Sequence, residues 1–583
     1  MTQARTVPAI FLALILIIGG TSWWLGGQEQ EIAAGPSSGP YMIAAANPDA
    51  TAAGREIVMK GGNAIDAAIA VQAVLTLVEP ESSGLGGGAF MVYFDKSANE
   101  VEAYDGRETA PAGATSKLFL DDNGQPLDFR DAVVSGRSVG VPGVVKMLWL
   151  AHQKHGALPW SDLFEPAIRL AENGFEVQPK LQEWLEWDPV LKHMPVAGDY
   201  FYKTDANGEK VPYKAGEIIK NPAYAKTLRE IAEKGPDGFY EGDVAQAIVD
   251  AVQNAPARPG TLSLDDLANY QAKERDALCG LYRIYRVCTM PPPTSGGLTT
   301  LQTLGILENF DLKGMGAMSV TAIHFIAEAE ALAYADRDQY IGDPDFVDVP
   351  VAAMLDKKYL ESRANLIDAS ISMGQAKPGS PGEEHADNWG ANADMSQPST
   401  SHFSIIDPGG NVVSMTTSVE GPFGSHLMAA GMILNNQLTD FSFLPERDGK
   451  PVANAVAPGK RPRSSMDPAI VFNKDGTFHA AIGSPGGSKI IGYVNQALIA
   501  MLDWDMDVPG AIGLPHFIDR NGPLEIEEGT PLEQKIPEFE QLGHEVKVER
   551  MMSGLHGILV MPDGSLDGGA DPRRDGNVVS GTR

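Results

Sequence analysis

The stretch Thr400-Ser401-His402-Phe403-Ser404-Ile405-Ile406 contains a strand pattern from residue 402, and Val412–Ser418 has the pattern of the strand that returns after a turn at 408–411. The run before it, residues 374–399, is dense in Gly, Pro, Ser, Ala, Asp and Asn. Such a run buries little apolar surface, so we expect it to be mobile. A long flexible segment that leads directly into a hairpin is unusual inside one compact domain. It is expected if the chain is cut before Thr400, although an ordinary loop connection stays open on this pattern alone.

A second element of chemical interest lies further along the chain. Phe478–Gly483 reads as a strand, Ser484-Pro485-Gly486-Gly487-Ser488 as a tight turn, and 489–502 as an apolar helix that Ser488 can cap. Backbone N–H groups of a glycine turn at the start of a helix attract negative charge, which is how an oxyanion hole is built. Taken alone, however, a strand, two glycines and a helix are usually structural.

The rest of the chain reads as mixed helix and strand. Residues 47–80 predict two helices, and the glycine-rich 84–88 turns into a strand over 89–94, followed by a second strand over 101–104. Residues from about 140 to 340 are mainly helical, with 321–335 the clearest periodic segment.

Composition excludes several classes of protein. Among the 583 residues, 45 Lys and Arg against 76 Asp and Glu give a net charge of −31. This balance argues against general nucleic-acid binding, which depends on neutralising phosphates. The eleven His residues form no H-E-x-x-H pattern, and two cysteines cannot build a Cys-rich metal site, so we expect neither a metal nor a cofactor.

The two cysteines, Cys279 and Cys288, flank a strand-like segment, 281–287. If the chain folds back near Gly280, the two sulfurs can meet. A disulfide requires an oxidising compartment, and two unpaired thiols remain an equal alternative.

The N-terminus points to export. Residues 1–27 combine a short basic start with an apolar run and Trp23-Trp24, which predicts a cleaved signal peptide or an uncleaved membrane anchor. Residues 28–40 are polar and read as a linker. We therefore expect an exported protein, either periplasmic or anchored in the membrane and facing the periplasm or cell exterior.

Several longer motifs carry a resemblance to a known family. In order along about residues 44–574, they resemble those of the γ-glutamyltransferase (glutathione hydrolase) family. They are Gly84-Leu85-Gly86-Gly87-Gly88, Asp105-Gly106-Arg107-Glu108-Thr109-Ala110-Pro111, Met290-Pro291-Pro292-Pro293-Thr294-Ser295-Gly296-Gly297, Thr400-Ser401-His402-Phe403-Ser404, Leu434-Asn435-Asn436-Gln437, Lys460-Arg461-Pro462-Arg463-Ser464-Ser465-Met466, Gly483-Ser484-Pro485-Gly486-Gly487-Ser488 and Asp571-Pro572-Arg573.

The resemblance implies an α+β fold, the four-layer αββα sandwich of the N-terminal-nucleophile hydrolases, made as a precursor that cuts itself. The cut would fall between Ser399 and Thr400, giving a large subunit, 41–399, and a small subunit, 400–583, in one interlocked domain. The Thr400 hydroxyl would then attack a γ-glutamyl amide such as glutathione, with its own α-amine as base. The acyl group would pass to water or to the amine of an amino acid or peptide.

The resemblance also assigns binding roles. Gly486 and Gly487 would hold the oxyanion. Ser418, where many members have Thr, would place its hydroxyl within hydrogen-bonding distance of the Thr400 hydroxyl. For the zwitterionic glutamyl end, Arg107 suits the α-carboxylate through its bidentate fork, with Ser464 and Ser465 adding donors. Asp440 and Gln437 would receive the α-ammonium.

Two features separate this chain from well-studied members. Glu420 stands where those members have Asn, and it would add a negative charge beside Asp440. That charge favours an ammonium and disfavours a glutaryl group, which cephalosporin-acylase-like members accept. The segment 443–456, which resembles the family's lid, is shortened. An acylase of other amides, or an uncleaved inactive binding homologue, remains the alternative to a γ-glutamyl enzyme.

Overall fold

The computed structural model describes residues 38–382, 389–392 and 399–583. The predicted signal or anchor, 1–27, and nearly all of the linker lie outside the described residues, as does part of the run before Thr400. The first strand, β1 (Pro40–Ala45), begins at the last residue of the predicted linker. Within the described ranges, no helix combines the length and apolarity needed to cross a bilayer.

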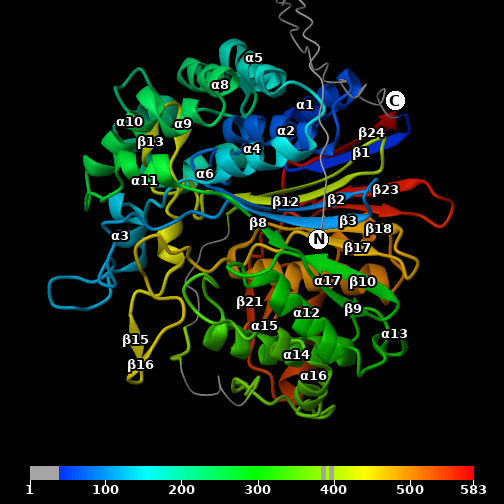
Figure 1. Ribbon diagram of the computed structural model, residues 1–583. Helices are drawn as coiled ribbons and strands as arrows, with labels where there is room; N and C mark the ends of the chain where they lie inside the picture. Colours follow the sequence, from blue (N-terminus) through cyan, green and yellow to red (C-terminus); the bar gives the residue numbers. More distant parts are fainter. Residues whose placement is uncertain (1–37, 383–388, 393–398) are drawn as a thin grey trace, which may run out of the picture. The chain divides into compact units, whose positions relative to one another are not determined.

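Two antiparallel sheets form the centre of the fold (Figure 1). The first has seven strands, in the order β24 (Asn577–Thr582), β1, β11 (Ser401–Ile406), β12 (Val412–Ser418), β2 (Gly88–Asp95), β3 (Glu100–Asp105) and β8 (Lys273–Asp276). The second has six, in the order β23 (Leu566–Ala570), β22 (His556–Val560), β18 (Phe478–Gly483), β17 (Ala469–Phe472), β10 (Tyr285–Thr289) and β9 (Leu278–Tyr282). Both sheets therefore contain strands from both sides of position 400.

Helices cover the outer face of each sheet (Figure 1). On the seven-stranded sheet these include α1 (Pro48–Lys60), α2 (Ala64–Val78), α4 (Val144–His155), α5 (Glu165–Asn173) and α8 (Pro222–Lys234). On the six-stranded sheet they include α12 (Gly296–Leu307), α14 (Val320–Tyr340) and α17 (Ile490–Leu502). The four-layer αββα prediction is confirmed.

The alternation of side chains along the strands explains the layering. In β2, Met91 and Tyr93 belong to the apolar core beneath α2, whereas Phe90, Val92 and Phe94 belong to the core between the sheets. Successive side chains of a strand point to opposite faces, so a strand that is apolar throughout must be covered on both sides. The sequence of β2 thus requires a sheet with a layer above and a layer below.

The remaining elements are short and surround this sandwich. The helices are α3 (Phe129–Val133), α6 (Pro179–Trp187), α7 (Ala197–Phe201), α9 (Asp237–Tyr240), α10 (Gly242–Gln253), α11 (Leu264–Asn269), α13 (Leu312–Met315), α15 (Val351–Met354), α16 (Lys357–Ala364), α18 (Val508–Ile512) and α19 (Ile536–Gln541). The strands are β4 (Phe175–Glu176), β5 (Tyr202–Thr204), β6 (Lys210–Pro212), β7 (Ile218–Ile219), β13 (Met428–Ala429), β14 (Met432–Ile433), β15 (Glu446–Arg447), β16 (Lys450–Pro451), β19 (Phe517–Ile518), β20 (Leu524–Glu527) and β21 (Val546–Glu549).

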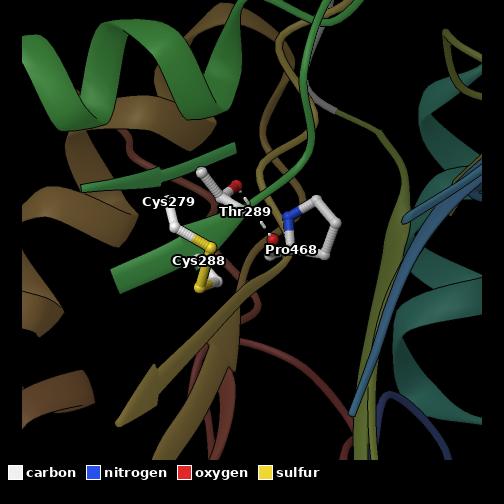
Figure 2. The surroundings of a disulfide bond; sticks show 4 residues. All are labelled: Cys279, Cys288, Thr289 and Pro468. Atoms are coloured by element: carbon white, nitrogen blue, oxygen red, sulfur yellow. Dashed lines mark hydrogen bonds between the residues drawn. A yellow bond between two sulfur atoms is a disulfide. The ribbon is translucent and has the colours of Figure 1, made fainter. Parts of the chain in front are cut away.

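The cysteines are joined as a disulfide across β9 and β10 (Figure 2). Cys279 is paired in register with Cys288, and the next residue, Thr289, donates its hydroxyl to the Pro468 carbonyl at 3.0 Å. The predicted reversal near Gly280 is wrong. The chain turns at Arg283, whose φ is +55°, so that Cys279 and the residues after it form a strand of their own.

Candidate functional site

Thr400 directly precedes β11, and its backbone is strained. Its φ is +100°, a region that a β-branched residue rarely occupies, and holding it costs on the order of 1–3 kcal/mol. The residue is buried, with 4 % of its surface exposed. Such strain persists only where the surroundings hold it, and it concentrates at functional sites. The Ser399–Thr400 junction that the sequence singles out is therefore also a place where the backbone is distorted.

Ser418, at the end of the neighbouring strand β12, contacts the Thr400 side chain. The two hydroxyl oxygens, Thr400 Oγ1 and Ser418 Oγ, lie 2.9 Å apart. The backbone N–H of Glu420 donates to Ser418 Oγ at 2.8 Å. Because a hydroxyl oxygen has two lone pairs, Ser418 can accept that N–H and still accept the proton of Thr400. The structure thus places the Ser418 hydroxyl within hydrogen-bonding distance of the Thr400 hydroxyl, as expected from the sequence.

The glycine turn after β18 supplies a donor for a developing negative charge. The backbone N–H of Gly486 donates to the Ser399 carbonyl oxygen at 3.2 Å, which is the carbonyl that Thr400 would attack. Gly486 has φ +142° and Gly487 has φ +58°, and a Cβ on Gly486 would lie 2.7 Å from a ring carbon of Tyr493. Only glycine fits there, and its N–H is aimed as an oxyanion donor must be.

The predicted helix cap at Ser488 is wrong. A short 3₁₀ turn, Gly487–Lys489, precedes α17, so the residue before the helix is Lys489 and no side chain caps it. The Ser488 hydroxyl oxygen instead accepts a hydrogen bond from Arg520 Nη1 at 2.6 Å. The extra turn moves Ser488 away from the capping position.

The first glycine-rich motif positions the backbone on the other side of Thr400. A Cβ on Gly87 would lie 2.0 Å from the Ser418 carbonyl oxygen, and one on Gly86 would lie 2.1 Å from that of Ile433. The Asn435 amide also donates to the Gly86 carbonyl at 2.8 Å. Because these glycines have no side chain, the segments at 86–87, 418 and 433–435 can pack closely against one another. This packing fixes the position of Ser418.

Arg107 and Asp440 are joined to each other. Arg107 Nη2 donates to Asp440 Oδ2 at 2.6 Å and to the Arg463 carbonyl at 2.9 Å, and Nε donates to the Pro462 carbonyl at 3.1 Å. Arg107 is fully buried, whereas the Asp440 side chain is 11 % exposed. The sequence assigns these residues to opposite charges of a substrate, but the structure places Arg107 behind Asp440. Its Nη1 has no hydrogen-bond partner among the described residues and lies nearest to the Glu108 carboxyl group, 3.7 Å from Oε2.

Gln437 completes the acidic end of the site. Its Nε2 donates to Asp440 Oδ2 at 2.9 Å, which fixes the orientation of the amide. Its Oε1 is buried and has no hydrogen-bond partner among the described residues. A buried unpaired acceptor is costly, so a ligand donor at this point would be favoured. A carboxylate and an orphaned carbonyl oxygen together suit an ammonium group.

Ser464 and Ser465 also line the pocket. Ser465 Oγ accepts a hydrogen bond from Arg337 Nη2 at 2.7 Å, and Ser464 Oγ accepts one from the Met466 backbone N–H at 3.1 Å. Because the Ser464 oxygen accepts that N–H, its hydroxyl proton is directed elsewhere and suits a carboxylate ligand. The guanidinium of Arg337 beside Ser465 adds positive charge.

Glu420 is buried at the junction of the two ends. Its φ is +80°, its backbone N–H contacts Ser418, and its carboxylate accepts a hydrogen bond from the Asn436 amide. It therefore serves the nucleophile through its backbone while its side chain adds negative charge to the pocket wall. The sequence predicted the charge but gave no signal for the backbone contact.

Glu108 is a buried acid beside this site. Its carboxyl group has no hydrogen-bond partner within the described chain, and Oε2 lies 3.7 Å from Arg107 Nη1. Burial raises the pKa of Glu108 to about 8, against the opposing effect of Arg107. At neutral pH the group is therefore largely a neutral acid.

Within the described residues, one group of three side chains has the composition of a metal site. His324, Glu328 and His544 are buried, with potential ligand atoms within 4.8 Å of one another. However, His324 Nδ1 and His544 Nε2 contact each other at 2.8 Å, and the Glu328 carboxylate accepts from Ser372 Oγ at 2.6 Å and Met373 N at 3.0 Å. Each ligand atom has a protein partner, so we assign no chemistry to this group.

A single pocket unites most of the predicted residues. It encloses about 320 Å³, including open space at its mouth. Arg107 and Gly486 contact this set from behind rather than lining the pocket. Sequence reasoning assigned no role to three of the lining residues, although two of them belong to a motif quoted above for its resemblance. The lining residues are Thr400, Ser418, Glu420, Gln437, Asp440, Arg463, Ser464, Ser465, Met466, Gly487 and Ile490.

Several known proteins are similar to this chain over most of its length. The chain is 40 % identical over 558 residues to a glutathione hydrolase proenzyme of Escherichia coli (strain K12), covering 93 % of this chain and 91 % of that protein. It is 36 % identical over 562 residues to an acylase ACY 1 proenzyme of Pseudomonas sp. (strain SE83), covering 94 % of each.

A solved structure, the cephalosporin acylase from Bacillus halodurans, superposes with a TM-score of 0.79 at 27 % identity and covers 97 % of this chain and 99 % of its own. The profile of the gamma-glutamyltranspeptidase family matches residues 50–581. Because that match spans nearly the whole described chain, the protein belongs to the gamma-glutamyltranspeptidase family.

Proposed function

We propose that this protein is an exported γ-glutamyl hydrolase and transferase that acts on glutathione and related γ-glutamyl compounds after cutting itself before Thr400. The observation that carries the proposal is the arrangement around one bond. The Thr400 hydroxyl lies 2.9 Å from Ser418 Oγ, and the Gly486 N–H is bonded to the Ser399 carbonyl oxygen at 3.2 Å. A nucleophile, a proton acceptor and an oxyanion donor therefore surround the predicted scissile carbonyl.

Self-cleavage is the first step. Thr400 Oγ1 attacks the Ser399 carbonyl carbon, the C–N bond to Thr400 breaks, and the hydroxyl proton ends on the Thr400 nitrogen. Water then opens the ester, which gives a Ser399 carboxylate and restores the Thr400 hydroxyl. The negative charge on the Ser399 oxygen is stabilised by Gly486, and one such donor is typically worth about 2.7–4 kcal/mol in the transition state.

The freed α-amine supplies the base for the second step. A free α-amine has a pKa of ~7.7–8.0 and can accept the proton of its own hydroxyl near neutral pH. The nearest histidine in sequence, His402, cannot take this role. Its Nδ1 contacts Thr416 Oγ1 at 2.9 Å, its Nε2 contacts Ser404 Oγ at 3.2 Å, and burial holds its pKa well below the usual range. Thr400 therefore depends on its own backbone nitrogen.

The enzyme reaction reuses the same groups. The Thr400 hydroxyl attacks the γ-carbonyl carbon of the donor, the amide C–N bond breaks, and the leaving amine takes the proton. The resulting acyl-enzyme is transferred to water or to the amine of an amino acid or peptide. The Gly486 and Gly487 N–H groups hold the oxyanion. No cofactor takes part in either step as we propose it.

Two groups of side chains recognise the donor. The Asp440 carboxylate and Gln437 Oε1 receive the α-ammonium, while Ser464 and Ser465 meet the α-carboxylate, with the buried Arg107 adding positive charge from behind the pocket lining. The Glu420 carboxylate adds a second negative charge near the ammonium. This pattern favours a zwitterionic glutamyl group over a glutaryl group, which carries a carboxylate and no ammonium. This preference for an ammonium group distinguishes the proposed γ-glutamyl enzyme from the alternative, an acylase of other amides, which the acylase relatives also suggest.

Export is supported by the disulfide. The Cys279–Cys288 bond would persist in an oxidising compartment and be reduced in the cytosol, which agrees with the signal or anchor predicted over 1–27. The membrane would be contacted only through that segment. The two cleavage products, 41–399 and 400–583, would stay together because each of the two sheets is hydrogen-bonded from strands of both products.

A paired assay tests the proposal. Purified protein should contain a fragment that begins at Thr400 by mass spectrometry, and it should hydrolyse a γ-glutamyl anilide faster than a glutaryl anilide. Equal or faster glutaryl turnover would favour the acylase. An intact, inactive chain would favour the binding homologue.

A further inference from the structure

The residues on both sides of the predicted scissile bond are held by one turn. This turn, residues 79–83, follows α2. The Ser399 hydroxyl donates to the Glu81 carbonyl at 2.6 Å, and the Ser83 hydroxyl donates to Ser401 Oγ at 2.9 Å. The residue before Thr400 and the residue after it are thus fixed to the same few residues of the large subunit, which leaves Thr400 itself to be accounted for.

Arg574 holds Thr400. Its Nη1 donates to the Thr400 carbonyl oxygen at 3.0 Å and to Ser82 Oγ at 3.3 Å, and its Nε donates to the Ser553 carbonyl at 3.1 Å. The Arg574 side chain is 3 % exposed. Because guanidinium donors have a fixed planar geometry, anchoring Nε on Ser553 determines where Nη1 points. The guanidinium therefore connects the turn, the small subunit and the strained residue.

The charge of Arg574 is poorly compensated, which makes a purely structural role costly. Its nearest acid is Glu79, at 4.0 Å from Nη1, and burial raises the pKa of Glu79 to about 7 even though Arg574 opposes that shift. The neighbouring Glu81 carboxyl is also buried and has no hydrogen-bond partner in the described chain. A buried cation beside partly protonated acids is expensive to keep, and the carbonyl of Thr400 is one of the few groups that it serves.

We infer that Arg574 is a positioning residue for self-cleavage. By fixing the Thr400 carbonyl, it limits rotation about the Cα–C bond of Thr400, and together with the Gly486 bond to the Ser399 carbonyl it holds the backbone on both sides of the strained residue. Arg574 touches neither the bond that forms, from Oγ1 to the Ser399 carbonyl carbon, nor the C–N bond that breaks. The inference rests on the proposed function, because it concerns the rate of that first step.

The test compares precursors purified soon after synthesis and followed by gel and intact mass. In Arg574→Ala, we expect cleavage before Thr400 to slow roughly 10- to 100-fold, the factor that relaxing backbone strain of this kind would cost. Millimolar guanidinium ion should restore much of the rate by occupying the vacated site, and Arg574→Lys should cleave at an intermediate rate. The matched control is Arg550→Ala, in the same subunit, whose side chain is 60 % exposed. It should cleave like the wild type.

The outcomes separate this inference from the proposal beneath it. If the wild type is not cut before Thr400, the proposed function fails and the inference fails with it. If the wild type is cut and Arg574→Ala is cut at the same rate, the inference about Arg574 is overturned while the proposed function stands. Slow cleavage that neither guanidinium nor lysine relieves would indicate a merely structural role and would also overturn it. Should Arg574→Ala not fold, Ser82→Ala replaces it, with a smaller slowing expected and an unchanged rate counting against the inference.

Discussion

The two ends of the pocket differ in the charge of the groups that form them. The groups around the Thr400 hydroxyl and the Ser399 carbonyl are neutral: the Ser418 hydroxyl and the backbone N–H groups of Gly486 and Glu420. At the donor-binding end they are charges, with Arg107 bonded to Asp440 before any ligand arrives. In the proposed function, the neutral end can act on any acyl group of suitable size, whereas the charged end selects which group is presented. Such a division would be compatible with both glutathione hydrolases and acylases among the relatives of one chain.

The largest effect should come from the neutral end. Thr400→Ala removes the nucleophile of both steps, so we expect no cleavage and a loss of activity of at least about 10⁴-fold, as for other covalent catalysts. Thr400→Ser keeps the hydroxyl and should still cleave. Intact mass and anilide hydrolysis measure the two effects. A cleaved, active Thr400→Ala protein would remove this residue from the site.

The next effect should come from the charged end. Asp440→Asn keeps the shape but removes the charge that balances Arg107 and meets the ammonium, so we expect kcat/KM for γ-glutamyl donors to fall roughly 100-fold. Self-cleavage should be nearly unaffected, since we assign Asp440 no part in that step. Steady-state kinetics and a cleavage gel on the same preparation test this separation. An equal loss in both assays would mean that the two ends are not independent.

Ser418 tests the neutral end of the pocket, because its uncharged hydroxyl contacts the Thr400 hydroxyl. Ser418→Ala removes the acceptor for the Thr400 proton, and we expect both cleavage and turnover to slow by about 10-fold or more. Ser418→Thr, which restores the residue common in the family, should be close to wild type. Parallel rate measurements would show it, and an unaffected alanine variant would leave Ser418 with no catalytic role.

Glu420 should change selectivity more than rate. Replacing it with Gln removes one negative charge near the ammonium but keeps the backbone N–H on Ser418. We expect the preference for γ-glutamyl over glutaryl anilide to narrow a few-fold, an effect of about 1 kcal/mol or less. The ratio of the two kcat/KM values is the readout. A widened preference would contradict the role given to this carboxylate.

The last prediction concerns the stability of the fold behind the charged end, not turnover. Because the pKa of Glu108 is about 8 in the folded protein and lower in the unfolded chain, the folded state binds the extra proton between those values. Its stability therefore declines as pH rises from about 5 to 8. Glu108→Gln should flatten that part of the Tm profile, and the exposed Glu100→Gln serves as the control. An identical pH profile for wild type and Glu108→Gln would show that Glu108 is ionised.

The sequence was most informative where structure is local. The break before Thr400 and the glycine turn at 486–487 stood out in short local patterns, whereas the four-layer fold and the role of Ser418 were implied by the resemblance to the family. The Arg107–Asp440 pair joins distant segments, and side-chain types alone do not decide whether such residues bind a substrate or each other. The misplaced turn near Gly280 has a similar cause. Arg283 tolerates a positive φ because its side chain is bonded to Asp503 at 2.9 Å and to the Phe310 carbonyl at 2.8 Å, contacts that no local pattern reveals.

The most direct test of the account is to trap the acyl group. Denaturing mass spectrometry of the protein, quenched during turnover of a γ-glutamyl substrate, should show the fragment that begins at Thr400 carrying one additional glutamyl group, with the modification on that first residue. A glutamyl adduct on any other side chain, or turnover by a chain that remains uncut, would contradict it.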